Sequence, residues 1–255
     1  CAGATVHIAP PSEQGEDIDA LLAWWRGCPL DVSFLPTPVA EYAFSHQIDH
    51  PTLRTLLIGG DRLRQFTRHP GFAVINNYGP TEATVVASSG AMVPGGVLHI
   101  GAPVDNARLY VLDAHHQPVA QGVAGELYIG GAGVARGYLN RAQMTAERLL
   151  DDPFSAQPGA RMYRTGDLVR WLDDGTLDYL GRNDDQVKIR GVRIELGEIE
   201  SRLAALPGIN EAVVLAREDQ PGQPRLVAYF TGQDSVEVAA PAQLRTQVQA
   251  HLPDY

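Results

Sequence analysis

Apolar positions in the first third of the chain alternate between strand-like runs and a helical stripe. One helical face carries four apolar residues, Ile18, Leu21, Leu22 and Trp25. Short apolar runs typical of buried strands occur at residues 5–8, 32–35, 55–58 and 73–76. We expect helical stretches between these runs, because this alternation is the signature of crossover connections on a mostly parallel sheet. A binding site on such a sheet would lie in the loops that follow its strands.

After Pro94 the pattern changes to short strands separated by glycine and proline. Strands are predicted at residues 108–112, 126–129 and 178–180. We therefore expect residues 1–93 to form part of a large α/β core subdomain. Residues 94–183 would form a small β-rich, barrel-like subdomain.

A third pattern begins near Asp184. Strands are expected at residues 186–189, 212–216 and 226–230. A helical stripe that ends at Pro207-Gly208 comprises Leu196, Ile199, Leu203 and Leu206, and a final stripe comprises Leu244, Val248 and Leu252. Residues 184–255 would thus be an incomplete, mobile α+β subdomain, hinged at the charged segment 181–185. The overall fold class is α/β.

Composition narrows the function. The 255 residues are 44% hydrophobic, and the 20 Lys and Arg residues are scattered in a chain of net charge −10, which disfavours nucleic-acid binding. No apolar run approaches the roughly 20 residues of a membrane span. Two cysteines give no disulfide framework, and the eight histidines show no zinc-ligand spacing. We expect a cytoplasmic protein with a small or nucleotide ligand.

Both ends of the chain look like cuts. It begins at Cys1 rather than Met, and it stops at residues 252–255 just as a helical pattern closes. We therefore expect a fragment that exposes a sheet edge and apolar surface, because a sheet cut partway leaves unpaired strand groups.

Three segments carry candidate chemistry. At residues 76–82 a Gly-Pro turn follows a buried strand, and its Thr, Glu and Tyr suit a phosphate, a magnesium ion and a purine, although such a turn can also be purely structural. Residues 163–167 place one carboxylate on a turn between strands, where it could accept the hydroxyls of a ribose or simply stabilise the turn. Residues 181–191 combine Gly, Arg and Lys and could equally be a solvated linker.

The order and spacing of these segments are more specific than any one of them. Between them lie Gly-Glu-Leu-Tyr-Ile-Gly-Gly at residues 125–131 and Ala-Arg-Gly-Tyr at residues 135–138, and Arg-Ile-Glu-Leu-Gly-Glu-Ile-Glu follows at residues 193–200. Together they resemble the fifth to eighth core motifs of the adenylation domains of nonribosomal peptide synthetases. These domains are part of the adenylate-forming superfamily, which also contains acyl-CoA synthetases and luciferases.

The resemblance implies a reaction and a set of roles. A carboxylate would be joined to the α-phosphate of ATP with Mg²⁺, and the acyl group would then pass to the phosphopantetheine thiol of a carrier protein. Thr81 would contact phosphate and Glu82 would bind magnesium. The adenine would be framed by Gly60, Asn76 and Tyr78. The ribose would be bound by Asp167, the nucleotide site would be completed by Tyr179, Arg182 and Lys188, and Asp184 would be the hinge.

The resemblance also implies where the amino-acid substrate binds. The pocket positions fall on Phe34, Leu57, Gly59, Asn77, Val85 and Val86. All except Asn77 are apolar or glycine, which favours an uncharged aliphatic substrate, with leucine preferred. The alternative is that these positions are merely sheet core.

Some elements of the family lie outside this sequence. They are the upstream phosphate loop, the Asp that binds the substrate amino group and the downstream catalytic lysine, so we expect the chain alone to be inactive. Expected partners are a peptidyl carrier protein, a condensation domain and an MbtH-like protein. Two alternatives remain open: a carboxylic acid:CoA ligase of the same superfamily, and a non-catalytic nucleotide-binding or interaction fragment.

Overall fold

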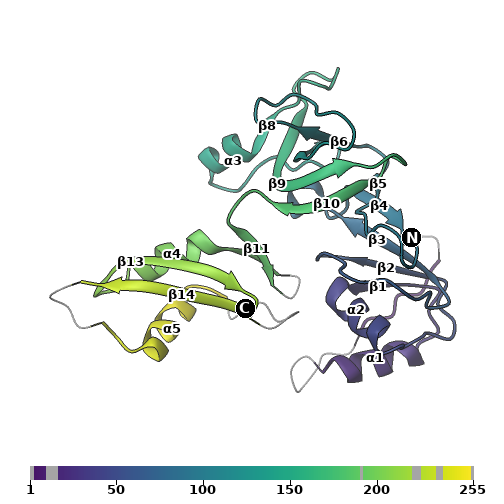
Figure 1. Ribbon diagram of the computed structural model, residues 1–255, viewed down its shortest axis with the longest axis horizontal. Helices are drawn as coiled ribbons and strands as arrows, with labels where there is room; N and C mark the ends of the chain where they lie inside the picture. Colours follow the sequence, from purple (N-terminus) through teal and green to yellow (C-terminus); the bar gives the residue numbers. More distant parts are fainter. Residues whose placement is uncertain (1–2, 10–16, 190–191, 220–224, 234–237, 254–255) are drawn as a thin grey trace. The chain divides into compact units, whose positions relative to one another are not determined.

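The computed structural model describes residues 3–9, 17–189, 192–219, 225–233 and 238–253. It contains two compact units, Cys1–Asn183 and Asp184–Tyr255. Figure 1 shows the elements of both units, and each unit is described by itself. Among the described residues, no helix combines the length and the apolar character needed to cross a membrane.

The first sheet of unit Cys1–Asn183 is parallel in its first three strands. Its order is β1 (Val32–Pro36), β2 (Thr55–Gly59), β3 (Ala73–Tyr78), β4 (Ser88–Ala91) and β5 (Ala102–Pro103). β1, β2 and β3 run parallel, whereas β4 and β5 are antiparallel to their neighbours. The predicted mostly parallel sheet is therefore confirmed, with two antiparallel strands added at one edge.

Two helices cover one face of this sheet, α1 (Ile18–Gly27) and α2 (Thr37–Ser45) (Figure 1). The carboxylate of Asp17 caps α1 by accepting hydrogen bonds from the amides of Asp19 and Ala20, each at 3.0 Å. Leu22 and Trp25, which belong to the apolar stripe predicted for α1, are buried in the core. They pack with strand residues that alternate along the sheet, Leu35, Leu56, Ile58 and Val74. The intervening residues Phe34, Leu57 and Ile75 face the other way and are less buried.

Two sequence expectations for this region are wrong. Residues 5–8 form no strand; Val6 and Ile8 are 79% and 84% exposed, and no described strand pairs with them. The connection between β2 and β3 contains no helix. Instead, Leu63 and Phe66 are each buried in the core from an irregular loop. Their helix-like spacing therefore does not come from a helix.

The second sheet of this unit is antiparallel and open. Its order is β10 (Leu177–Arg182), β9 (Arg161–Trp171), β7 (Gly125–Gly131) and β6 (Ala107–Leu112). β8 (Leu149–Asp151), which follows α3 (Ala142–Arg148), also pairs with β9. No ladder joins β6 to β10 in the described part of the chain, so the barrel-like sheet does not close. Its core contains Leu127, Ile129, Val169 and Leu177.

The turn predicted at residues 163–167 is in fact part of the long strand β9. Glu126 pairs with Leu168 whereas Tyr128 pairs with Arg164, so β9 has extra residues between these two pairs. Gly166 lies within this bulge at a φ of 75°. The turn-like sequence therefore marks a bulge in a continuous strand.

In its described residues, unit Asp184–Tyr255 combines two hairpins with two helices. Its elements are β11 (Gln186–Ile189), β12 (Val192–Glu195), α4 (Leu196–Ala204), β13 (Ile209–Arg217), β14 (Arg225–Gly232) and α5 (Pro241–Gln249). Of the stripe predicted there, Leu196, Ile199 and Leu203 lie on α4, and Leu206 lies beyond its end. Leu196 and Leu203 are buried, and Leu244 of α5 joins them in the core. Leu252 lies beyond the end of α5. Cys1, Arg190, Gly191, Asp254 and Tyr255 lie outside the described residues.

Candidate functional site

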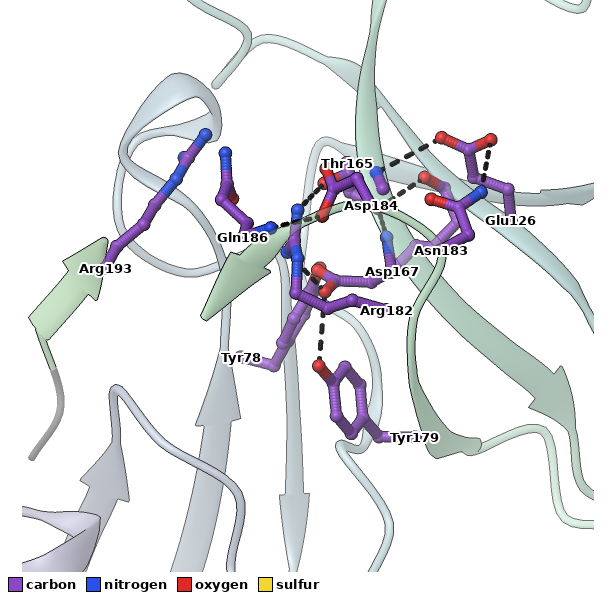
Figure 2. Close-up of polar contacts among 12 residues, drawn as sticks. Tyr78, Glu126, Thr165, Asp167, Tyr179, Arg182, Asn183, Asp184, Gln186 and Arg193 are labelled. Atoms are coloured by element: carbon purple, nitrogen blue, oxygen red, sulfur yellow. Dashed lines mark hydrogen bonds and ion pairs between the residues drawn. The ribbon is translucent and has the colours of Figure 1, made fainter. Parts of the chain in front are cut away.

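The carboxylate of Asp167 is the centre of a cluster built from three strands (Figure 2). The hydroxyl of Tyr78, at the end of β3, donates a hydrogen bond to Oδ2 of Asp167. On β10, the hydroxyl of Tyr179 and Nη1 of Arg182 donate to Oδ1 at 3.3 and 2.7 Å. Asp167 is only 5% exposed, and the side chain of Arg182 is 13% exposed. The result is a buried carboxylate with three donors.

The bulge in β9 places Asp167 at this centre. The hydroxyl of Thr165 donates to the carbonyl of Leu127 at 2.7 Å and accepts from the amide of Asp167 at 2.9 Å. Nη2 of Arg182 donates to the carbonyl of Thr165 at 2.9 Å. Because the bulge is bonded on both sides, the direction of the Asp167 side chain is fixed.

Both tyrosines of the cluster keep their protons. Burial raises the pKa of Tyr78 well above its usual range, and the negative charge of Asp167 raises it further. Burial and the charge of Asp167 raise the pKa of Tyr179 in the same way. The guanidinium of Arg62 lies 5.9 Å from the centre of the Tyr179 ring, within the range of a cation–π contact. Arg62 is a residue that the sequence did not reveal.

Glu126 supports the bulge from the neighbouring strand β7. It binds the guanidinium of Arg164 in a bidentate pair at 2.9 and 3.1 Å. It also accepts from the amide of Gly166 at 3.2 Å and from Nδ2 of Asn183 at 3.0 Å. Glu126 thereby ties the bulge to the last residue of its unit (Figure 2).

A second carboxylate lies after β3, in the short 3-10 helix Thr81–Ala83. Glu82 is 7% exposed, and its Oε1 accepts a hydrogen bond from the hydroxyl of Tyr138 at 2.6 Å. Burial, followed by the hydrogen bond to Glu82, raises the pKa of Tyr138 well above its usual range, so this hydroxyl is a donor. The preceding residue, Thr81, is exposed.

The turn that carries Glu82 is strained and tightly closed. Thr84 and Val85 have positive φ angles of 57° and 73°, and for a β-branched residue such a value is an outlier. The amide of Ala87 donates to the carbonyl of Tyr78 at 2.8 Å and closes the turn. A Cβ on Gly79 would lie 2.5 Å from the carbonyl oxygen of Val85, so only glycine fits. Strain of this kind is typical of functional sites.

Four of the six predicted pocket residues share one face of the parallel sheet. Phe34 lies beside Leu57, and Gly59 lies beside Asn77. Because side chains alternate along a strand, these four face away from the helix-covered side. Oδ1 of Asn77 accepts a hydrogen bond from Ser89 at 2.7 Å. The last two, Val85 and Val86, belong to the strained turn, where Val85 is 72% exposed.

The structure also describes the four other residues that the sequence predicted for the nucleotide site and the hinge. Gly60 follows β2 at a φ of 90° and is exposed. Asn76 is 4% exposed, and its amide donates to the carbonyl of His99 at 2.9 Å, so its side chain is held by the protein itself. Two residues belong to unit Asp184–Tyr255: Asp184 accepts from the amide of Gln186 at 3.3 Å, and Lys188 is exposed on β11.

The side chains of unit Cys1–Asn183 suit a magnesium ion that is bound partly by the substrate better than a metal ion that is bound by protein ligands alone. The described residues contain no group of three or more His, Cys, Asp or Glu side chains that could hold a metal ion. Magnesium is usually bound by one or two carboxylates together with substrate phosphates and water. A single buried carboxylate such as Glu82, with a hydroxyl residue beside it in Thr81, fits that pattern.

Comparisons with known proteins agree with this geometry. The linear gramicidin synthase of Brevibacillus parabrevis includes a polypeptide that is 48% identical over 264 residues, which cover 100% of this chain and 3% of the relative. Bacitracin synthase 1 of Bacillus licheniformis is 46% identical over 258 residues, covering 100% of this chain and 5% of the relative. The chain thus spans only a small part of the curated relatives it matches.

Solved structures give the same result. An artificially fused adenylation–PCP di-domain from Klebsiella oxytoca matches with a TM-score of 0.74 and 26% identity, over 96% of this chain and 46% of that one. PA1221, a nonribosomal peptide synthetase protein with adenylation and PCP domains, matches with a TM-score of 0.72 and 31% identity, over 90% of this chain and 47% of its own.

The AMP-binding enzyme family matches residues 1–139, which is more than half of the chain. The match contains β3, the turn with Glu82, and Tyr138. The relatives and the solved structures extend the similarity to the strands that carry Asp167 and Arg182. This chain therefore belongs to the AMP-binding enzyme family.

Proposed function

We propose that this chain is part of an adenylation domain that activates an amino acid with ATP, giving an aminoacyl adenylate and pyrophosphate. The observation that carries the proposal is the cluster in which Tyr78, Tyr179 and Arg182 converge on Asp167. Two aromatic rings beside one fixed carboxylate suit a nucleoside, because a ring offers a face to the base and a carboxylate accepts from sugar hydroxyls.

The residues would divide the work as follows. Asp167 would accept the ribose hydroxyls, and Tyr78 would pack against the adenine with Gly60 and Asn76 near it. In the completed site, Tyr179, Arg182 and Lys188 would also contact the nucleotide, and Asp184 would act as a hinge. Catalysis of this phosphoryl transfer depends mainly on positioning and on charge neutralisation.

The turn after β3 would hold the phosphates. The hydroxyl of Thr81 would donate to a phosphate oxygen, and the carboxylate of Glu82 would bind magnesium. When bound, magnesium neutralises charge that develops on the phosphate oxygens. The buried environment of Glu82 strengthens this electrostatic contact relative to water.

The sheet face with Phe34, Leu57, Gly59 and Asn77 would line the substrate pocket, together with Val85 and Val86. Two properties support an uncharged aliphatic substrate, with leucine preferred. The face is apolar apart from Asn77, whose Oδ1 already accepts from Ser89. A Cβ on Gly59 would lie 2.7 Å from the carbonyl oxygen of Asn77, so this position of the face takes glycine and carries no side chain.

The activated amino acid would pass to the phosphopantetheine thiol of a peptidyl carrier protein. The PCP domains named in the matching solved structures support this partner. A condensation domain and an MbtH-like protein would be further partners of a cytoplasmic module. Because the relatives are far longer than this chain, we assign the activity to the complete module rather than to the 255 residues alone.

The test is exchange of labelled pyrophosphate into ATP by the complete module. Leucine is expected to give the highest rate, with valine and isoleucine lower and charged amino acids at the level of the control without amino acid. If aliphatic amino acids stay at background while an aryl or fatty acid reacts in the presence of CoA, the chain is part of a CoA ligase. If ATP binds but no acid supports turnover, the chain is a non-catalytic nucleotide-binding module.

A further inference from the structure

We propose that Tyr138 is a positioning residue that holds the carboxylate of Glu82 in the orientation in which it binds magnesium. This inference rests on the proposed function and deepens it. It assigns a role to a residue that comes from a different part of the chain, between β7 and α3.

The geometry is that of a supported ligand. The hydroxyl of Tyr138 donates to Oε1 of Glu82 at 2.6 Å, and Glu82 is 7% exposed. A buried carboxylate on a short helix can rotate about its side-chain bonds unless another group fixes it. Hydrogen bonds to metal-binding carboxylates provide this restraint in metal sites, and the loss of such a partner typically lowers metal affinity by about 10- to 100-fold.

The backbone around Tyr138 is itself anchored to the same turn. The amide of Ala135 donates to the carbonyl of Glu82 at 2.8 Å, and the hydroxyl of Thr84 donates to the carbonyl of Gly133 at 2.7 Å. The segment from Gly133 to Tyr138 therefore contacts the Glu82 turn through both backbone and side chain. A tyrosine on such a segment cannot move independently of Glu82.

The segment from Gly133 to Tyr138 is also bonded to β9 and to α3. Nη2 of Arg161 donates to the carbonyls of Ala135 and Arg136 at 3.2 and 2.6 Å. The amide of Tyr138 donates to Oγ1 of Thr145 in α3 at 3.0 Å. The Tyr138 hydroxyl thus reaches Glu82 from a support that two other elements hold in place.

The first variant is Tyr138→Phe, which removes one hydroxyl and keeps the ring. ATP binding to the complete module is measured by calorimetry over a series of Mg²⁺ concentrations and in a metal-free buffer. The Mg²⁺ concentration that gives half of the full effect on ATP binding is expected to rise about tenfold. Binding of ATP without metal is expected to stay unchanged, because the proposed role of Tyr138 is to orient the metal-binding carboxylate of Glu82.

Two further variants sharpen the test. In a Glu82→Gln background, Tyr138→Phe is expected to add nothing to the change in Mg²⁺ dependence, because coupled residues are non-additive. Thr145→Val keeps the size of the side chain but removes the anchor of the Tyr138 amide. It should shift the Mg²⁺ dependence in the same direction, and it keeps the proposal testable if Tyr138→Phe does not fold.

Tyr110→Phe is the matched control. Its hydroxyl also donates to a buried carboxylate, that of Asp152 at 3.1 Å, but on β6. This variant should lower stability without changing the Mg²⁺ dependence. An unchanged Mg²⁺ dependence in Tyr138→Phe, or an additive effect in the Glu82→Gln background, overturns the role of Tyr138. Failure of the unaltered module to bind ATP would instead overturn the proposed function, and this inference with it.

Discussion

Substitution of Asp167 by asparagine is expected to lower pyrophosphate exchange by the complete module at least about 100-fold. The amide has an NH2 group, which only donates, in place of one carboxylate oxygen, and its remaining oxygen carries no charge, so its hydrogen bonds to the ribose hydroxyls are fewer or weaker. A hydrogen bond to a charged group contributes about 1.5–3 kcal/mol, and each 1.4 kcal/mol corresponds to about a factor of ten. The loss of two such contacts accounts for the expected decrease.

The same substitution is expected to destabilise unit Cys1–Asn183 of the isolated chain. Arg182 and Asp167 have side chains that are only 13% and 7% exposed, and their ion pair is 2.7 Å long. Removal of one partner of a buried ion pair reduces the compensation of the other charge, which typically costs up to about 3–5 kcal/mol. Urea denaturation of the purified chain measures this change.

Asp178→Asn is the control on the same pair of strands. Asp178 pairs with Arg170 at 2.9 Å, but the arginine side chain is 46% exposed. A solvent-exposed pair contributes about 0–1 kcal/mol, so this variant should retain nearly all of its stability and exchange activity. Equal losses in the two variants would mean that the Asp167 cluster has no special role.

Substitution of Gly79 by alanine is expected to have the second large effect. The new Cβ would lie 2.5 Å from the carbonyl oxygen of Val85 and 2.7 Å from the amide nitrogen of Ala87. Both are backbone atoms, so the turn itself must shift, and overpacking of this kind costs about 1–3 kcal/mol. Since the turn positions Tyr78 and Glu82, exchange should fall about 100-fold, the loss that a displacement near 1 Å can cause.

Gly27→Ala is the control for the glycine substitution. Gly27 is the last residue of α1, and nothing lies within 4 Å of an added Cβ. Its thermal unfolding temperature should stay the same or rise slightly, because alanine in a helix is favoured over glycine by about 0.5–1 kcal/mol. A Gly79→Ala protein with wild-type exchange and stability would show that the turn tolerates a side chain.

The parallel sheet could be predicted because its strands are short, continuous apolar runs. The run at residues 5–8 has the same composition, but a strand also needs a neighbour, and local sequence does not show whether one is present. The helix that the sequence predicts between β2 and β3 is absent because spacing alone does not show whether apolar residues lie on one helical face. Leu63 and Phe66 have helical spacing, yet each is buried separately.

The candidate site was predictable where its residues are adjacent in sequence. Motifs indicated Tyr78, Glu82 and Asp167. Arg62, in the loop after β2, and Glu126, on β7, contact the cluster from segments that are far from Asp167 along the chain. The bulge in β9 was hidden because glycine before aspartate also occurs in turns. Asn76 and Asn77 lie on opposite faces of the sheet, which the alternation of side chains along β3 could have predicted.

If a nucleotide binds at Asp167, hydrogen bonds from protein donors would be exchanged for hydrogen bonds from the ribose. Two phenol hydroxyls already donate to the carboxylate that would receive a ribose. A carboxylate has about four acceptor sites, and the three donors of the cluster fill three of them, so one protein donor would have to leave before both ribose hydroxyls could be accepted. The net contribution of the two ribose hydroxyls would therefore be smaller than the sum of two new hydrogen bonds, by about the free energy of the bond that is lost.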